Sequence, residues 1–222
     1  ALVGESGSGK SVISQTIMGL LPSQAKIYGG SILFSPNSEG KPIIDIAALN
    51  PSGKPIRDIR GGQISIIFQE PMTSLSPLHT IGNQILEALM LHRRLHTNEA
   101  TQVVIDMLRL VGFPDPKRGF KTYPFELSGG LRQRSMIAMA LICRPCLLIA
   151  DEPTTALDVT VQHQILNLLN REQETRDMAM VLVTHDLGVV AGRTDETMVM
   201  YAGNVVEKTS THELFNNMQH PY

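Results

Sequence analysis

The segment GESGSGKS, from Gly4 to Ser11, constrains the fold of this chain more than any other. The apolar residues ALV precede it and VISQTIMGLLP follows it. We therefore expect a strand, a glycine-rich loop and a helix that ends at Pro22. The backbone N–H groups of such a loop and the positive end of the helix together attract phosphate. The start of the sequence thus indicates an α/β fold with a phosphate-binding loop.

The loop matches the complete pattern G-x-x-x-x-G-K-[ST], which is typical of P-loop nucleotide-binding proteins. In this pattern Lys10 places a cation between the β- and γ-phosphates, and Ser11 offers its hydroxyl to Mg²⁺. An ordinary glycine-rich turn is the alternative, and the flanking strand and helix argue against it. The residues expected to surround the phosphates are Gly4, Glu5, Ser6, Gly7, Ser8, Gly9, Lys10 and Ser11.

The segment LLIADE places two carboxylates at the end of an apolar strand. Open α/β sheets bind their ligands at the carboxyl ends of their strands. We therefore expect Asp151 to reach Mg²⁺, directly or through water, and Glu152 to act as general base on an attacking water. A solvated strand end is the alternative, which the phosphate loop upstream disfavours.

Other segments alternate between strand and helix patterns. Apolar and β-branched residues predict strands at 63–68, 146–152 and 178–185, and a hairpin over 197–208. We expect the hairpin to turn at Ala202 and Gly203. Residues 23–62 are rich in turn-forming residues and predict short strands and turns.

Residues 81–142 carry a helical pattern throughout. The apolar residues expected on one face of the first helix are Ile81, Ile85, Leu89 and Met90. Thr97 is the candidate N-cap of the second helix. The sequence therefore predicts an α/β sheet of parallel strands that carries a helical insertion.

Composition excludes some classes of function. The formal net charge is −2 and tryptophan is absent, so we expect no nucleic acid as a partner. The best apolar stretch, residues 136–150, is interrupted by Arg144 and Pro145, and it is shorter than a membrane-spanning helix. The sequence opens inside an expected strand and stops at HPY, so we expect a piece of a longer protein.

A second glycine-rich turn occurs in ELSGGLRQR, from Glu126 to Arg134. One helix N-terminus contributes about 0.3–2 kcal/mol to holding an anion, whereas micromolar nucleotide binding needs about 8 kcal/mol. This turn is therefore too weak to be a second complete nucleotide site. It is suited to completing a site held elsewhere, or, in the plainer alternative, Ser128 only caps a helix.

Several of these motifs together resemble the ATP-binding subunit of an ABC transporter. The similar segments are GESGSGKS (Walker A), Gln69 in IIFQEP (Q-loop), LSGGLRQR (signature), LLIADEP (Walker B), TALD (D-loop) and His185 in VTHD (switch histidine). The resemblance implies a P-loop NTPase (RecA-like) core at residues 1–75 and 143–222. It also implies an all-helical signature subdomain at residues 76–142.

The resemblance also implies a role for each motif. Two cassettes would sandwich ATP head to tail, with Ser128, Gly129 and Gly130 of one cassette on the γ-phosphate held by the other. Asp158 would organise the interface, and His185 would hold the γ-phosphate and orient the attacking water. Gln69 would bind the metal and take part in catalysis, and it would transmit movement to a membrane partner. ATP and Mg²⁺ are the implied cofactors.

Further segments, among them FQEPMTSLSPLHTIGNQI, ADEPTTALDVTVQ and the final HPY, resemble the dipeptide, oligopeptide, nickel and glutathione importer branch. This implies transmembrane permease subunits and a second ABC ATPase, homologous or identical, as partners. An extracytoplasmic solute-binding protein would take part indirectly, and the subunit would lie peripherally on the cytoplasmic face of the cell membrane. The alternatives are a soluble ABC ATPase of translation or DNA repair and a P-loop kinase or switch protein.

Overall fold

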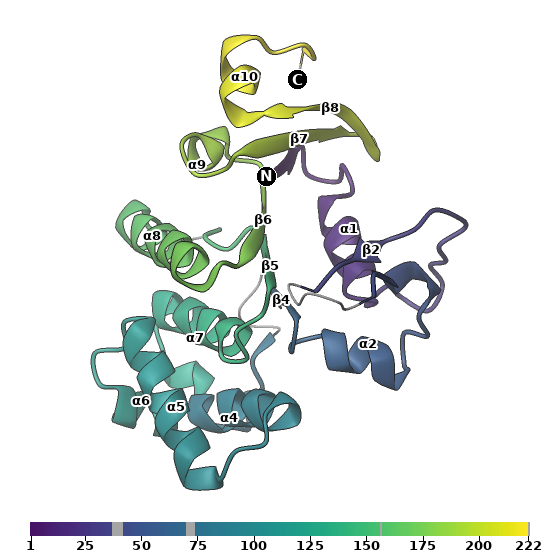
Figure 1. Cartoon of the computed structure of the whole chain (residues 1–222). Coiled ribbons are helices and arrows are strands. Elements are labelled where there is room, and N and C mark those ends of the chain that lie inside the picture. The colour runs from purple at the N-terminus through teal and green to yellow at the C-terminus, as the bar shows by residue number, and fades with distance from the viewer. Residues whose placement is uncertain (37–41, 70–73, 156, 222) are drawn as a thin grey trace. The chain divides into compact units, whose positions relative to one another are not determined.

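The computed structural model describes residues 1–36, 42–69, 74–155 and 157–221 (Figure 1). The chain divides into two compact units. The first unit consists of Ala1–Arg57, Ile149–Glu152 and Met180–Tyr222, and the second of Asp58–Leu148 and Pro153–Ala179. The boundaries expected at 75/76 and 142/143 stay a prediction.

A sheet with the strand order β5-β6-β1-β7-β8 organises the first unit. Its strands are β1 (Leu2–Gly4), β5 (Leu147–Asp151), β6 (Ala179–Thr184), β7 (Glu196–Tyr201) and β8 (Asn204–Ser210), although residues 147, 148 and 179 at the starts of β5 and β6 fall in the second unit. β1 pairs in parallel with both β6 and β7, so two late strands flank the strand that precedes the phosphate loop. The antiparallel pair β7–β8 turns at residues 202–203, as the sequence predicted. The expected parallel α/β sheet is thus confirmed.

The helix after the phosphate loop, α1 (Lys10–Ile17), is shorter than expected. The prediction that it ends at Pro22 is wrong, because Gly19 takes a left-handed conformation (φ 62°) and closes the helix earlier. The Gly19 N–H donates to Thr16 O, and the Leu20 N–H donates to Gln15 O. This pair of bonds is the Schellman arrangement that ends many helices at a glycine.

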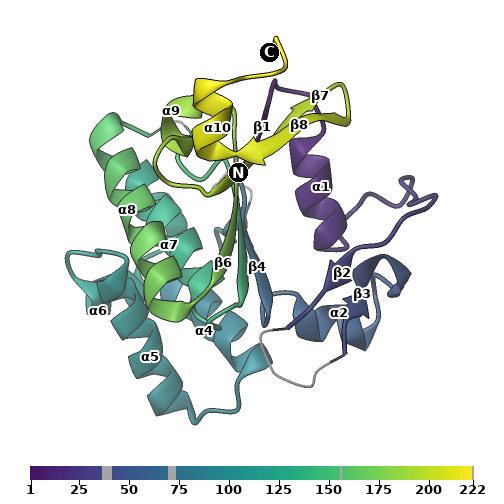
Figure 2. The same cartoon turned by 45° about the horizontal axis from the view of Figure 1, so that its top comes forward.

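The rest of the first unit supports the sheet. β2 (Leu33–Phe34) and β3 (Ile44–Asp45) form a short antiparallel pair, as expected, and the turn η1 (Ile46–Ala48) follows. The helix α2 (Lys54–Ile59) was not expected; it starts in this unit, and its last two residues belong to the second unit. Near the C-terminus, α9 (Leu187–Val190) and α10 (Thr211–Asn216) complete the unit, and α10 packs against β7 and β8 (Figure 2). The core there consists of Val3, Val190, Val199 and Leu214.

The second unit is mainly helical, and it contains residues 81–142, for which the sequence predicted helices. Its elements are β4 (Ile64–Ile67), α4 (Ile81–His92), α5 (Thr97–Leu110), α6 (Pro116–Lys121), η2 (Pro124–Glu126), α7 (Gly129–Leu141) and α8 (Val159–Arg176). The helices α4, α5 and α6 pack on one another, and α7 contacts α4, α5 and β4. Ile85, Leu108, Ile137 and Leu141 are fully buried between them.

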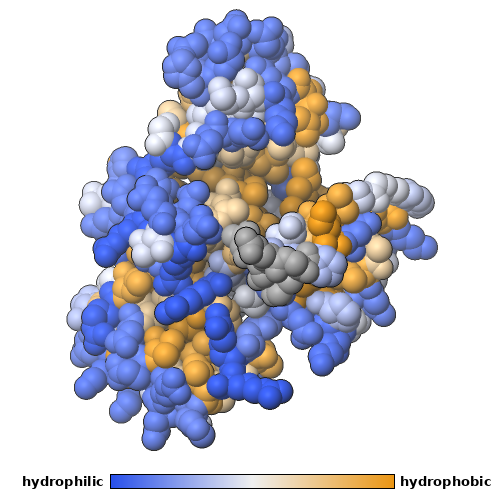
Figure 3. Space-filling view, in the orientation of Figure 1, coloured by the Kyte–Doolittle hydropathy of each residue, from blue (hydrophilic) through white to orange (hydrophobic). Residues whose placement is uncertain are grey.

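Two details of these helices differ from expectation. Met90 does not share the buried face of Ile81, Ile85 and Leu89: it is 42% exposed, because it follows Leu89 by about 100° around the helix. Thr97 is the first helical residue and not the N-cap, a position that His96 takes without a side-chain hydrogen bond. Figure 3 shows apolar side chains between hydrophilic ones on the surface of these helices.

Gly82 provides a test of the packing between α4 and α6. A Cβ atom at this position would lie 2.2 Å from Cγ of Phe120. We expect Gly82→Ala to lower the free energy of unfolding by about 1–3 kcal/mol, because overpacking displaces the ring. Chemical denaturation measures this change. Gly29→Ala is the control, since its Cβ meets no atom within 4 Å, and an equal loss in both variants would contradict the packing argument.

Candidate nucleotide site

The phosphate loop joins β1 to α1 by a tight turn in which the Ser8 N–H donates to Glu5 O (3.1 Å). Gly7 and Gly9 have φ angles of 81° and 100°, which residues with a side chain rarely adopt. Gly9 is the N-cap of α1 and has no side chain to accept the first N–H groups of that helix. Those N–H groups are therefore available to an anion at the positive helix end.

Lys10 lies inside the loop and is only 5% exposed. Its Nζ donates to Gly4 O at 2.7 Å and to Glu5 O at 2.8 Å. An ammonium group has three protons, and two of them are used here. The backbone carbonyls thus fix the cation in the turn and leave its third proton for an anion.

The atoms around Gly4 leave no room for a side chain. A Cβ atom there would lie 2.3 Å from Met200 O and 2.8 Å from Ser8 Oγ. Ser8 Oγ is buried and has no hydrogen-bond partner among the described residues. The loop therefore packs directly on the backbone of β7, with a polar oxygen enclosed beside it.

Asp151, the last residue of β5, is 5% exposed. Burial raises the pKa of its carboxyl, the neighbouring Glu152 adds to the rise, and a hydrogen bond from Ser11 and the charge of Lys10 oppose it. Its Oδ1 has no hydrogen-bond partner within the described part of the chain. A buried unpaired carboxylate oxygen beside a serine hydroxyl fits Mg²⁺, which binds hard oxygen ligands and keeps several waters.

Glu152 and His185 meet in the first unit. His185 Nδ1 lies 2.9 Å from Glu152 Oε1, and the Glu152 side chain is 12% exposed against 59% for His185. The Glu152 N–H donates to Val183 O (2.9 Å), and its φ of 48° is left-handed. Because an ionised carboxylate only accepts hydrogen bonds, His185 Nδ1 must carry a proton in this contact.

The signature turn belongs to the second unit. Ser128 is exposed and is the N-cap of α7, where its Oγ accepts from the Leu131 N–H at 3.4 Å. A Cβ atom on Gly129 would meet nothing within 4 Å, whereas one on Gly130 would lie 3.3 Å from Val161. Ser128 therefore caps α7, and this bond leaves its hydroxyl proton unused; the lid role stays a prediction.

The remaining predicted site residues also lie in the second unit. Asp158 is exposed and caps α8, where its carboxylate accepts from the Val161 N–H at 3.0 Å. Gln69 is exposed just after β4, and residues 70–73 lie outside the described residues. The structure thus brings the phosphate loop, Asp151, Glu152 and His185 into one unit, and it holds Gln69, the signature turn and Asp158 in the other.

Sequence reasoning missed one contact of the loop. The Gly203 N–H, in the β7–β8 turn, donates to Ser8 O at 3.1 Å. The glycine in the hairpin turn was a visible signal, but it predicted only a turn. The hairpin and the phosphate loop are far apart in sequence, and no local pattern links them.

Metal-binding clusters and membrane-spanning helices are both absent from the described ranges, which omit residues 37–41, 70–73, 156 and 222. No three His, Cys, Asp or Glu side chains there gather to hold a metal ion by themselves. Every helix there is too short or too polar to span a membrane.

The fold and the loop define a P-loop nucleotide-binding domain, and comparison with known proteins specifies it. The sequence profile described as "ABC transporter" matches residues 1–155. The chain therefore belongs to the ABC transporter family.

Curated relatives are similar over the whole chain. The dipeptide transport ATP-binding protein DppD of Bacillus subtilis (strain 168) is 52% identical over 223 residues, covering 100% of this chain and 64% of the relative. The oligopeptide transport ATP-binding protein AmiE of Streptococcus pneumoniae serotype 4 is 50% identical, covering 100% of this chain and 60% of the relative. The chain thus spans less than two thirds of the length of these relatives.

Solved structures share the fold. The ATP-binding cassette MJ0796, dimeric in a post-hydrolysis state bound to ADP and Pi, has a TM-score of 0.80 and 28% identity, covering 95% of this chain and 84% of that chain. The protein cbiO1 of Clostridium perfringens, part of the ABC transporter complex cbiONQ, has a TM-score of 0.74 and 26% identity over 97% and 78% of the two chains.

Asp151 yields a prediction about stability. Its raised pKa means that the ionised carboxylate lowers stability at neutral pH, and that this cost disappears as the pH falls through the raised pKa toward the unfolded value of about 3.9. We expect Asp151→Asn to raise the free energy of unfolding at pH 7 by about 0.5–3 kcal/mol without nucleotide. The gain should vanish near pH 3.

Thermal melts with and without MgATP provide the control. The wild type should gain stability from MgATP if Asp151 then faces the cation, as predicted, and the variant should gain less. A variant that is less stable than the wild type at pH 7 without nucleotide, or that gains as much from MgATP, would contradict this account of Asp151.

Proposed function

We propose that the chain is the ATP-binding and ATP-hydrolysing part of an ABC importer for dipeptides, oligopeptides or related small solutes. The observation that carries the proposal is the Glu152–His185 contact in the same unit as the phosphate loop. A phosphate loop alone fits many nucleotide-binding proteins, and a general base next to a histidine adds hydrolysis.

Mg²⁺-bound ATP would supply a γ-phosphoryl group that water can attack. Lys10 and the first N–H groups of α1 would hold the phosphates, and Ser11 and Asp151 would hold the metal. Support for this comes from the third proton of Lys10 and the unpaired Oδ1 of Asp151.

Glu152 would take the proton of the attacking water at its carboxylate. His185 holds that carboxylate through Nδ1, which leaves its Nε2 for the γ-phosphate, whose oxygens would accept a hydrogen bond when Nε2 also carries a proton. Gln69 would share the water and the metal with this pair. The low exposure of Glu152 excludes most bulk water from competing for its carboxylate.

The second unit would serve the ATP bound by a partner ATPase. Ser128 Oγ accepts the Leu131 N–H and can still donate its proton, and Gly129 is open on its outer side. These features suit a lid on a γ-phosphate, with Gly130 beside it. Asp158, exposed at the start of α8, would face the same partner.

The transported solute and the membrane partners are inferred from the relatives. DppD and AmiE are described as dipeptide and oligopeptide transport ATP-binding proteins. We accordingly place the subunit on the cytoplasmic face of the cell membrane, with permease subunits and a second ABC ATPase. A solute-binding protein outside the membrane would deliver the peptide, and Gln69 would couple hydrolysis to the permease.

Glu152→Gln tests the hydrolytic function. In the full-length protein assembled with its permease in vesicles, we expect ATP binding within about twofold of the wild type. We also expect at least a 100-fold loss of ATP hydrolysis, because the amide accepts no proton from water. Uptake of a labelled dipeptide should stop, and ATP should hold two ATPase subunits together.

The control for this experiment is Glu174→Gln, an exposed glutamate of the second unit. It should hydrolyse ATP and import peptide as the wild type does. Hydrolysis at the wild-type rate in Glu152→Gln would contradict the general-base role. Normal hydrolysis without dipeptide uptake in the wild type would contradict only the peptide assignment.

Ser128→Arg tests the lid. The larger cation should leave ATP binding to the phosphate loop unchanged and abolish ATP-driven association of two subunits. Sedimentation of Glu152→Gln subunits with and without this change measures the effect. Ser210→Arg is the matched control, because Ser210 is also an exposed N-cap, at α10, and should lose about the same 0.5–2 kcal/mol of capping energy. Undiminished association in Ser128→Arg would exclude the lid.

A further inference from the structure

A pocket of about 470 Å³ opens in the second unit, away from every residue assigned above. It is lined by Leu110, Arg144, Pro145, Arg171, Glu172, Thr175 and Arg176. These residues come from the end of α5, the turn between α7 and β5, and the last two turns of α8. Its volume is in the range of small-molecule sites, about 300–1,000 Å³.

One side of the pocket is an ion pair. Arg176 Nε lies 2.6 Å from Glu172 Oε2, and the two side chains are only 17% and 5% exposed. A second nitrogen of Arg176 donates to Leu141 O at 3.2 Å. The two charges of this pair cancel. The contacts fix both side chains along one side of the pocket.

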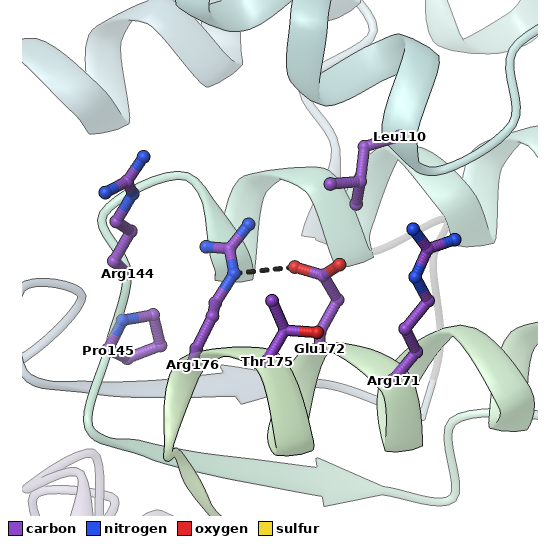
Figure 4. A pocket seen from close by; sticks show the side chains of 7 residues that line it. All are labelled: Leu110, Arg144, Pro145, Arg171, Glu172, Thr175 and Arg176. Carbon is purple, nitrogen blue, oxygen red and sulfur yellow. Dashed lines mark ion pairs between the residues drawn. The ribbon is translucent and has the colours of Figure 1, made fainter.

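The two other arginines of the lining differ from Arg176 in their exposure and in their ion pairs. Arg144 and Arg171 are exposed, and neither side chain makes an ion pair with another described residue. Figure 4 shows the side chains of Arg144, Arg171 and Arg176 pointing to the same side of α8. Because Glu172 is the one carboxylate among the lining residues and is paired with Arg176, the lining keeps two uncompensated positive charges.

The rest of the lining adds a hydroxyl and an apolar edge. Thr175 offers its hydroxyl beside the Arg176–Glu172 pair, and Leu110 points into the pocket from α5 (Figure 4). Pro145 closes the side next to Arg144. The backbone of Arg144 is left-handed (φ 53°), a conformation that costs an L-residue about 1–2 kcal/mol. Glycine would avoid this cost but would remove a guanidinium from the pocket.

We propose that this pocket binds a small phosphorylated anion. Arg144 and Arg171 lie at opposite ends of the lining, with the Arg176–Glu172 pair between them (Figure 4), and each guanidinium group can bind a phosphate group through two parallel N–H donors. The hydroxyl of Thr175 supplies a further donor, and Leu110 and Pro145 accommodate a short carbon skeleton. A concave site of this size suits a metabolite more than the flat surface of a protein.

Inorganic pyrophosphate is the probe, measured by calorimetry at low ionic strength. The experiment uses the Lys10→Ala background, so that the phosphate loop contributes little. We expect saturable binding that Arg171→Ala and Arg144→Gly each weaken by about tenfold or more, the loss expected for a charge-assisted contact. Arg144→Gly is chosen because glycine adopts the same backbone conformation without strain.

Arg94→Ala is the matched control, since Arg94 is an exposed arginine of the same unit outside the pocket. Its affinity for pyrophosphate should stay unchanged, and thermal melts confirm that all variants are folded. Binding that is equal in the two pocket variants and in the control overturns the proposal. A tetraglutamate peptide that binds as tightly as pyrophosphate also overturns the proposal. That result would indicate that the pocket binds an acidic segment of a partner protein. Neither result bears on ATP hydrolysis.

Discussion

The buried ammonium group of Lys10 is the contact on which the nucleotide site depends. A charge that is 95% buried is costly unless neighbouring dipoles compensate it, and here the carbonyls of Gly4 and Glu5 do so. Those carbonyls belong to a loop that turns through two glycines with positive φ, Gly7 and Gly9. The loop fits against β7 only because Gly4 has no side chain. Local chain geometry therefore creates the electrostatic centre, and no long-range ion pair is needed to hold it.

The division of the motifs between two units follows from what each must do. The residues proposed to bind the phosphates, the metal and the water lie at the ends of β1, β5 and β6, which the sheet holds side by side. The signature turn and Asp158 each cap a helix of the second unit, so the fold supports them independently of any ligand. If the lid belongs to another subunit, as proposed, the site could be completed and opened again without unfolding either part.

Much of this arrangement could be predicted from the sequence, and what failed did so for identifiable reasons. Continuous apolar runs located β4, β5 and β6, because buried parallel strands need them on both faces. The end of α1 was misplaced because proline is a conspicuous signal, whereas the stop was set by Gly19. Thr97 was taken for a cap because of its residue type, although the chain enters the helix one residue earlier. The contact between Gly203 and Ser8 could not be foreseen, since only the tertiary fold joins them.

The place of β1 in the sheet has a consequence for biosynthesis. Leu2 pairs with Val183 on one side and Met198 on the other, so both neighbours of this strand are translated long after it. At about 5–20 residues per second, a ribosome needs about 10–40 s to produce them. During that interval the nascent strand has two unpaired edges, which are open to wrong pairing with other chains. A chaperone that shields newly made segments would therefore raise the yield of folded protein, and slow codons placed between β1 and β6 would lower it.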